Sequence, residues 1–179
     1  MTPAAQTLTD ILTWGTLLLH ILFVVLIVLL VREYATRQTH GLLSLFRTYT
    51  LKLSFLLALG GSVMTLVYSE IFGFMPCGLC WLQRVFLYPQ VFLLGVALWK
   101  SDKGIPDYLI ALSVPGFLIA MYQHFIQMGG NSFLPCPAAA GAADCAQRII
   151  FEFGYITFPL MSATAFAALI LFSVILRSR

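Results

Sequence analysis

The chain has 179 residues, of which 60% are hydrophobic and only 9% are charged. Soluble domains contain about 25% charged residues, so this composition indicates an integral membrane protein and excludes an ordinary soluble enzyme. The net charge of +3 is small and dispersed along the chain, which argues against binding to nucleic acid.

Five long apolar stretches follow one another along the chain, each close to the roughly 20 residues needed to cross a bilayer. The first, residues 11–31, lacks the basic leading segment and the cleavage site of a signal peptide, so we interpret it as a retained helix. The other predicted spans are residues 53–74, 82–99, 108–128 and 153–176. Because lipid-spanning segments must satisfy their own backbone hydrogen bonds, we expect an all-α bundle that forms one membrane domain over residues 1–179.

The basic residues that flank these spans predict how the chain crosses the membrane. Only Arg84 and Arg148 flank one side. Eight basic residues flank the other: Arg32, Arg37, Arg47, Lys52, Lys100, Lys103, Arg177 and Arg179. This asymmetry predicts a cytoplasmic C-terminus and an extracytoplasmic N-terminus. All four cysteines then face the outside, where disulfides form and persist.

The four cysteines fall into two pairs. Cys77 and Cys80 form a Cys-x-x-Cys motif at the start of the third span, and Cys136 and Cys145 lie in the only sizeable loop, residues 129–152. The positive end of a helix dipole favours a thiolate at the first pair. Two neighbouring pairs can pass electrons by thiol–disulfide exchange, which indicates a redox enzyme.

Two other interpretations of the cysteines stay open at this point. A plain stabilising disulfide is one, although a short disulfide loop adds little chain-entropy stabilisation. A zinc ion held by all four thiolates is the other. Zinc sites of this kind use two closely spaced pairs, whereas eight residues separate Cys136 from Cys145.

Two polar side chains lie at a similar depth in the predicted bundle. Arg84 is four residues after Cys80, one helical turn deeper on the same face. An arginine in a membrane span indicates a function, here to stabilise the Cys80 thiolate or a bound ligand, although it can also snorkel to the headgroups. His124 is a second candidate near the end of the fourth span, where a packed histidine is the simpler interpretation.

A membrane quinone accepts the two electrons and two protons that two thiols release.

The motifs together resemble the DsbB family of membrane thiol oxidases, and most closely its short Gram-positive-type branch, BdbC. The resemblance covers about residues 60–176, so the span 11–31 is extra to a four-span core, residues 53–176. It rests on the following segments: Tyr68-Ser69-Glu70-Ile71, Pro76-Cys77-Gly78-Leu79-Cys80-Trp81-Leu82-Gln83-Arg84, Tyr88-Pro89, Tyr122-Gln123-His124, Pro135-Cys136, Cys145, and Phe153-Gly154-Tyr155-Ile156-Thr157-Phe158-Pro159.

The resemblance implies redox disulfides Cys77–Cys80 and Cys136–Cys145. A DsbA-like thioredoxin-fold partner would attack Cys136, and Cys145 would then exchange with Cys77. Cys80 would contact ubiquinone or menaquinone. The family is expected to keep the periplasm oxidising through such a chain of exchanges.

The resemblance also implies that Arg84 and His124 belong to the quinone site and that no metal is needed. The expected activity is that of a protein-dithiol:quinone oxidoreductase in the bacterial cytoplasmic (inner) membrane, which sustains disulfide bond formation. Two alternatives remain. One is a quinone-linked enzyme like vitamin K epoxide reductase, in which the loop pair precedes the Cys-x-x-Cys pair. The other is a non-enzymatic membrane protein that binds a metal through four cysteines.

Overall fold

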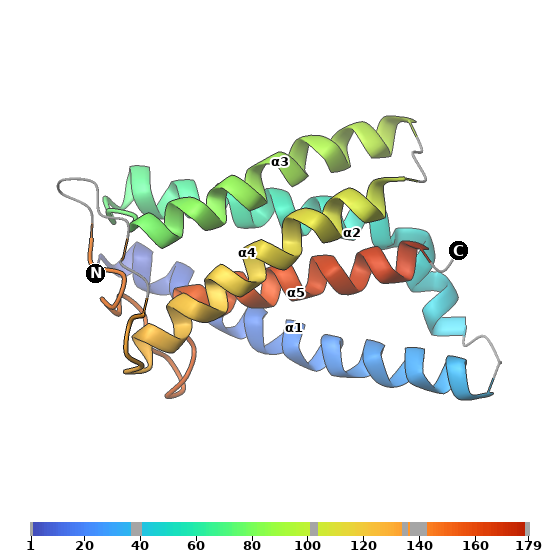
Figure 1. The fold of residues 1–179 in the computed structure, drawn as a ribbon, viewed down its shortest axis with the longest axis horizontal. Helices are drawn as coiled ribbons and strands as arrows, with labels where there is room; N and C mark the ends of the chain where they lie inside the picture. The colour runs from blue at the N-terminus through green and yellow to red at the C-terminus, as the bar shows by residue number, and fades with distance from the viewer. Residues whose placement is uncertain (1, 37–40, 101–103, 134–135, 137–142, 178–179) are drawn as a thin grey trace.

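The computed structural model describes residues 2–36, 41–100, 104–133, 136 and 143–177. They form an elongated bundle of helices that run back and forth along its length (Figure 1). The elements are α1 (Pro3–Thr36), α2 (Gly41–Leu66), the π-helical turn η1 (Val67–Ile71), α3 (Gly78–Lys100), α4 (Ile105–Gln127) and α5 (Phe158–Arg177). The five α-helices are long and apolar enough to cross a membrane, which confirms the predicted all-α architecture.

Three elements differ clearly from the predicted spans. α2 begins at Gly41 instead of residue 53, and the turn η1 that follows it ends at Ile71 instead of residue 74. α1 extends beyond residues 11–31 at both ends. α5 begins at Phe158 instead of residue 153, because Phe153 and Gly154 have φ values of 51° and 76°, outside the helical region. The chain instead turns tightly there, with an isolated antiparallel bridge between Glu152 and Ile156. Thr157 then starts the helix, since its hydroxyl accepts a hydrogen bond from the Leu160 N–H at 3.3 Å.

The centre of the bundle is a close contact between α4 and α5. Gly116 faces the ring of Phe166, which is fully buried in the main core cluster. A Cβ atom placed on Gly116 would lie 2.5 Å from Cζ of that ring. Glycine at this position therefore lets the two helices approach closely, as small residues do in membrane bundles.

Gly116→Ala is expected to destabilise the fold by about 1–3 kcal/mol, because the added Cβ would overlap the fully buried Phe166 ring and force it to shift. Unfolding of the purified protein in mixed micelles of mild and denaturing detergent measures the change. Gly60→Ala is the matched control, since a Cβ there meets no atom within 4 Å. Equal stability of the two variants would contradict this account of the α4–α5 contact.

Hydrogen bonds between polar side chains fix α1 against the rest of the bundle. The Thr9 hydroxyl is 2.7 Å from the Tyr68 hydroxyl in η1, and His20 Nε2 is 2.8 Å from the Thr164 hydroxyl on α5. The Tyr68 ring in turn packs edge-on against Phe158, with centroids 4.6 Å apart. Two separate contacts of this kind set both the rotation and the depth of α1.

Candidate functional site

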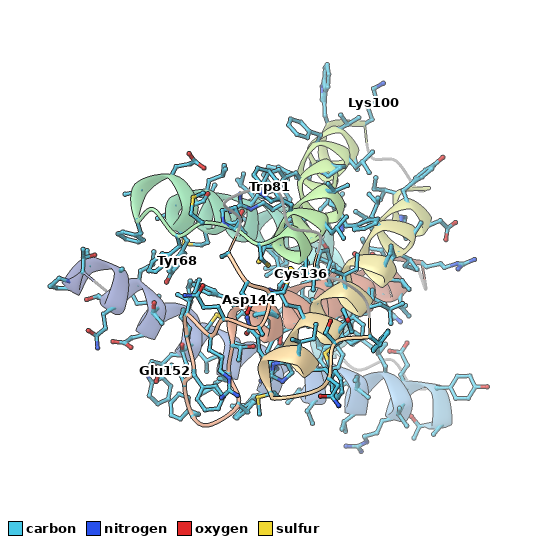
Figure 2. All side chains as sticks on the ribbon, turned by 60° about the vertical axis from the view of Figure 1, so that its left-hand side comes forward. Tyr68, Trp81, Lys100, Cys136, Asp144 and Glu152 are labelled. Atoms are coloured by element: carbon cyan, nitrogen blue, oxygen red, sulfur yellow. A yellow bond between two sulfur atoms is a disulfide. The ribbon has the colours of Figure 1, made fainter. Side chains whose placement is uncertain are left out.

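The structure brings both cysteine pairs together at one end of the bundle. Cys77 and Cys145 are buried, with exposed fractions of 3% and 1%, and Cys80 and Cys136 pack against them with partial exposure. This end also contains the loop that follows α4 (Figure 2). The gathering of four cysteines from distant parts of the chain was predicted by the redox interpretation.

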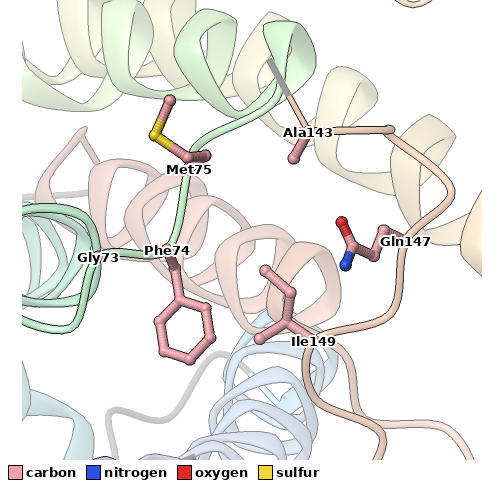
Figure 3. Close-up of a pocket in the computed structure, with 6 residues that line it drawn as sticks. All are labelled: Gly73, Phe74, Met75, Ala143, Gln147 and Ile149. Carbon is pink, nitrogen blue, oxygen red and sulfur yellow. The ribbon is translucent and has the colours of Figure 1, made fainter. Parts of the chain in front are cut away.

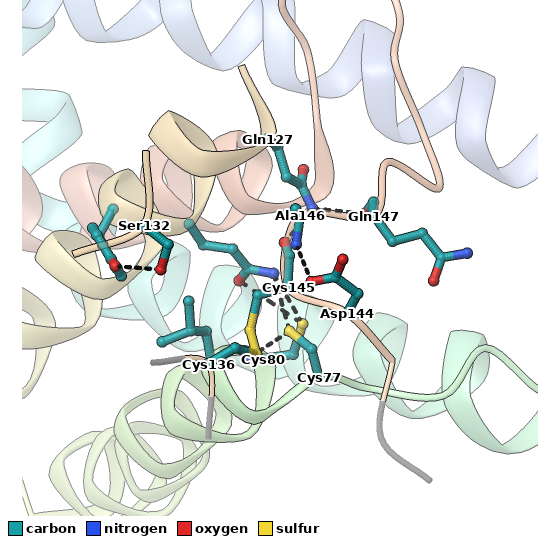
Figure 4. The surroundings of a disulfide bond; sticks show 12 residues. Cys77, Cys80, Gln127, Ser132, Cys136, Asp144, Cys145, Ala146 and Gln147 are labelled. Atoms are coloured by element: carbon teal, nitrogen blue, oxygen red, sulfur yellow. Dashed lines mark hydrogen bonds between the residues drawn. A yellow bond between two sulfur atoms is a disulfide. The ribbon is translucent and has the colours of Figure 1, made fainter. Parts of the chain in front are cut away.

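The two pairs are in different redox states. Cys136 and Cys145 form a disulfide, whereas Cys77 and Cys80 are free thiols (Figure 4). The Cys80 backbone N–H donates a hydrogen bond to Cys77 Sγ at 3.3 Å. This bond holds the two cysteines together at the first turn of α3. An oxidised pair thus lies beside a reduced one, which is the arrangement that thiol–disulfide exchange requires. The disulfide Cys77–Cys80 stays a prediction.

A neighbouring thiol and burial act on Cys77 in the same direction. The hydrogen bond with the Cys80 side chain and the loss of water around Cys77 both raise the pKa of the Cys77 thiol. Cys77 precedes the first residue of α3, at the boundary of the spanning segment. It therefore stays protonated near neutral pH while the pair is reduced.

A glutamine that the sequence analysis did not select holds the thiol pair. Gln123 Nε2 lies 3.1 Å from Cys77 Sγ and 3.4 Å from Cys80 Sγ. Gln123 Oε1 accepts a hydrogen bond of 2.6 Å from Gln83 Nε2. Both glutamines are buried in apolar helices. An amide in a membrane span is itself a signal, but only the fold shows which side chain it faces.

The next turn of α4 contacts the loop that carries the Cys136–Cys145 disulfide. Gln127 lies four residues after Gln123, on the same helix face. Its Nε2 donates to the backbone carbonyls of Cys145 at 3.4 Å and of Gln147 at 3.0 Å (Figure 4). One face of α4 therefore positions the thiol pair with one glutamine and the disulfide loop with the next.

Arg84 is buried, with an exposed fraction of 7%, and faces α2. Its Nη2 donates to the Thr65 carbonyl at 2.7 Å, and its guanidinium carbon lies 5.0 Å from the centre of the Trp81 ring. Thr65 lies two residues before the π-helical turn, a feature often found at functional sites. The Arg84 side chain does not extend toward the lipid headgroups, because its guanidinium is held inside the bundle by the Thr65 carbonyl.

His124 points away from the sulfur atoms that Gln123 contacts. Its Nδ1 lies 2.9 Å from the hydroxyl of Thr157, the residue that caps α5. The two predicted quinone residues therefore contact different helices, Arg84 on the side of α2 and His124 on the side of α5. Sequence position alone placed both at a similar depth without showing this difference.

A cleft opens beside the disulfide loop. It has a volume of about 400 Å³ and lies between the segment that follows η1 and the residues just after Cys145 (Figure 3). Its lining consists of Gly73, Phe74, Met75, Ala143, Gln147 and Ile149. None of the predicted quinone residues lines it, so we do not assign the quinone site there.

Residues 46–176 match the family described as "Disulfide bond formation protein DsbB". The chain belongs to the DsbB family. It is 41% identical to the SPbeta prophage-derived disulfide bond formation protein B of Bacillus subtilis over 115 residues, which are 64% of this chain and 76% of the relative. It is 38% identical to the probable disulfide formation protein of Chlamydia trachomatis over 124 residues, which are 69% of this chain and 88% of the relative.

A further relative supports the assignment to the branch that the sequence resembles. Disulfide bond formation protein C of Bacillus subtilis is 32% identical over 124 residues, which are 69% of this chain and 89% of the relative. No solved structure matches the chain significantly. Membership of the DsbB family, together with five membrane-spanning helices, identifies a multi-pass membrane oxidoreductase of disulfide bond formation. α1 lies outside the matched residues.

Proposed function

We propose that this DsbB-family protein is a thiol:quinone oxidoreductase, which reoxidises an extracytoplasmic DsbA-like dithiol oxidase and passes the electrons to membrane quinone. The observation that carries the proposal is the contact between an oxidised cysteine pair in a loop and a reduced pair at the start of a membrane helix. Cys136 of the loop pair is partly exposed, which suits attack by a protein partner. The helix pair lies at the start of a membrane-spanning helix, which suits reaction with quinones dissolved in the bilayer.

The exposure of the loop cysteines indicates the order of events. A partner thiolate attacks Cys136, which is partly exposed, and breaks the Cys136–Cys145 bond. The partner's second cysteine then displaces Cys136, which leaves an oxidised partner and two reduced loop cysteines. Cys145, buried against Cys77, exchanges with the Cys77–Cys80 disulfide and moves the two electrons to that pair. After this transfer the loop pair is oxidised again and the Cys77–Cys80 pair is reduced.

The residues around Cys80 fit a quinone. When bound, quinone supplies an acceptor for two electrons and two protons. Cys80 is partly exposed at the start of α3, and the indole of Trp81 beside it is 54% exposed. A guanidinium has five donors, and the bond from Arg84 to Thr65 uses one of them, which leaves donors for a carbonyl oxygen. His124 offers its other ring nitrogen from α4.

The distribution of charge supports an outward-facing site. The N-terminus lies at the same end of the bundle as the cysteines (Figure 1), and Lys100 lies at the opposite end of α3 (Figure 2). Basic residues at that opposite end favour the cytoplasm. We therefore propose that the N-terminus and both cysteine pairs are extracytoplasmic and that the C-terminus lies inside, in the bacterial cytoplasmic membrane.

The test is quinone reduction by the purified protein supplied with a reduced DsbA-like partner. Ubiquinone and menaquinone analogues are assayed separately, and Cys80→Ser is the paired variant. We expect reduction that falls to background in Cys80→Ser, because the serine hydroxyl cannot replace the thiolate as a nucleophile and electron donor. Folded wild-type protein that reduces neither analogue would overturn the proposed acceptor.

A further inference from the structure

We propose that Gln123 is a positioning residue whose side-chain amide, oriented by Gln83, stabilises negative charge on the Cys77–Cys80 pair and makes this pair a stronger oxidant. The inference rests on the proposed function in one respect, namely that the pair works by cycling between dithiol and disulfide. The inference concerns the reduction potential of the Cys77–Cys80 pair. It can be tested without bound quinone and without a bound partner.

The geometry of the amide favours donation to sulfur. Gln123 Nε2 lies 3.1 Å from Cys77 Sγ and 3.4 Å from Cys80 Sγ, whereas the amide oxygen is farther from Cys80 Sγ, at 3.8 Å. The two N–H groups of one amide can thus serve both sulfurs. Gln123 has an exposed fraction of 2%, so water competes little for these bonds.

Gln83 fixes which end of the Gln123 amide faces the sulfurs. The Gln83 Nε2 donates to Gln123 Oε1 at 2.6 Å and to the Leu79 carbonyl at 3.3 Å. Both of these partners are acceptors, so reversing the Gln83 amide would set its oxygen against two other oxygens. With Gln83 fixed as the donor, the Gln123 oxygen is held toward it. The Gln123 N–H groups then have only one direction left, toward Cys77 and Cys80.

The donors act on charge and therefore on the redox balance. A reduced pair can carry a thiolate, whereas a disulfide carries no charge, so N–H donors stabilise the reduced form more than the oxidised form. Stabilising the reduced form raises the reduction potential of the pair, as in strongly oxidising thiol proteins. A DsbA-like partner is itself a strong oxidant. A cysteine pair that accepts electrons from it therefore needs a high reduction potential, which the N–H donors of Gln123 help to provide.

The charged and titratable groups around the pair do not change in the variants that test this role. They are Arg84 on α3, His124 on α4, and Cys136, Asp144 and Cys145 in the loop. Removing an uncharged amide therefore isolates the contribution of hydrogen bonding from that of charge. The fixed positive charge of Arg84 acts in wild type and variants alike.

The experiment measures the reduction potential of Cys77–Cys80 in the full-length protein, without quinone or partner. Purified protein is equilibrated in thiol–disulfide buffers, alkylated, and analysed by mass spectrometry of the peptides that contain these cysteines. The variants are Gln123→Leu and Gln83→Leu. The matched control is Gln90→Leu, which removes a buried α3 glutamine that accepts from Ser113 and contacts no cysteine.

We expect Gln123→Leu to shift the equilibrium toward the disulfide about tenfold, which corresponds to a potential lower by about 30 mV. Gln83→Leu should produce a smaller shift in the same direction, since it frees the Gln123 amide to rotate. In both variants, Cys80 should be alkylated more slowly at a fixed neutral pH, because its thiolate loses a hydrogen-bond donor. Gln90→Leu should leave both quantities unchanged.

Unchanged potential and unchanged alkylation in folded Gln123→Leu would overturn the proposal. If that variant does not fold, Gln83→Leu carries the same test, because it leaves Gln123 in place. A shift that appears equally in Gln90→Leu would also overturn it, since the effect would then report general loosening of α3. Failure of quinone reduction in wild type leaves these measurements intact, so the two proposals fail separately.

Discussion

Cys136, and not Cys145, is expected to form the mixed disulfide with a DsbA-like partner. The physical reason is access: Cys136 is partly exposed, whereas Cys145 is 1% exposed and packed against Cys77, Leu79 and Ile126. Reaction at Cys145 requires the loop to open first, and the opening free energy slows it. We expect a rate difference of about 100-fold or more, which corresponds to roughly 2.7 kcal/mol of local opening.

The measurement uses chains that keep a single loop thiol, Cys145→Ser or Cys136→Ser, in a background where Cys77 and Cys80 are serine. Each is mixed with a partner whose only cysteine is activated as a mixed disulfide with thionitrobenzoate. Release of the coloured thiol gives the rate, and non-reducing electrophoresis shows the covalent complex. Equal rates for the two chains, or faster reaction at Cys145, would contradict the order of exchange that we propose.

Arg84→Ala is expected to impair quinone reduction and to leave reaction with the partner unchanged. Removing the guanidinium takes away a charge-assisted bond to Thr65 and the stacking on Trp81, together with the donors proposed for quinone. A charged hydrogen bond contributes about 1.5–3 kcal/mol, so the apparent KM for quinone should rise about tenfold or more. Steady-state assays at varied quinone, with fixed reduced partner, measure this change.

Two further variants separate the roles of charge and shape at this position. Arg84→Lys keeps the positive charge but loses the planar group, so we expect an intermediate KM. Arg148→Ala is the matched control, because Arg148 is an exposed arginine in the loop after Cys145, with its guanidinium carbon 4.8 Å from the centre of the Phe151 ring. An unchanged KM in Arg84→Ala, or the same rise in Arg148→Ala, would remove Arg84 from the quinone site.

The sequence was sufficient to predict the features that depend on local composition. Five apolar runs of spanning length predicted five helices, and the two cysteine pairs were correctly expected to meet. Arg84 was recognised because an arginine in an apolar run is unusual wherever its side chain points. Each of these signals is contained within one segment of the chain.

The missed features depend on how one helix is rotated against another. Gln123 and His124 are neighbours in sequence, yet one faces the sulfurs and the other faces Thr157. His124 stood out in the sequence and Gln123 did not, because a titratable ring is a stronger chemical signal than an amide. The late start of α5 was missed for another reason: the backbone of Phe153 turns left-handed within an apolar run.

The contacts that attach α1 are separate from those that hold the cysteines. α1 packs on α5 and α2, whereas the glutamines and thiols of the redox site belong to α3, α4 and the segments beside them. The match to the DsbB family covers residues 46–176, which begin after α1. A helix joined laterally through Thr9–Tyr68 and His20–Thr164 leaves the electron route untouched. Substitutions on the exposed face of α1 are therefore expected to leave the positions of the cysteines and their glutamine partners unchanged.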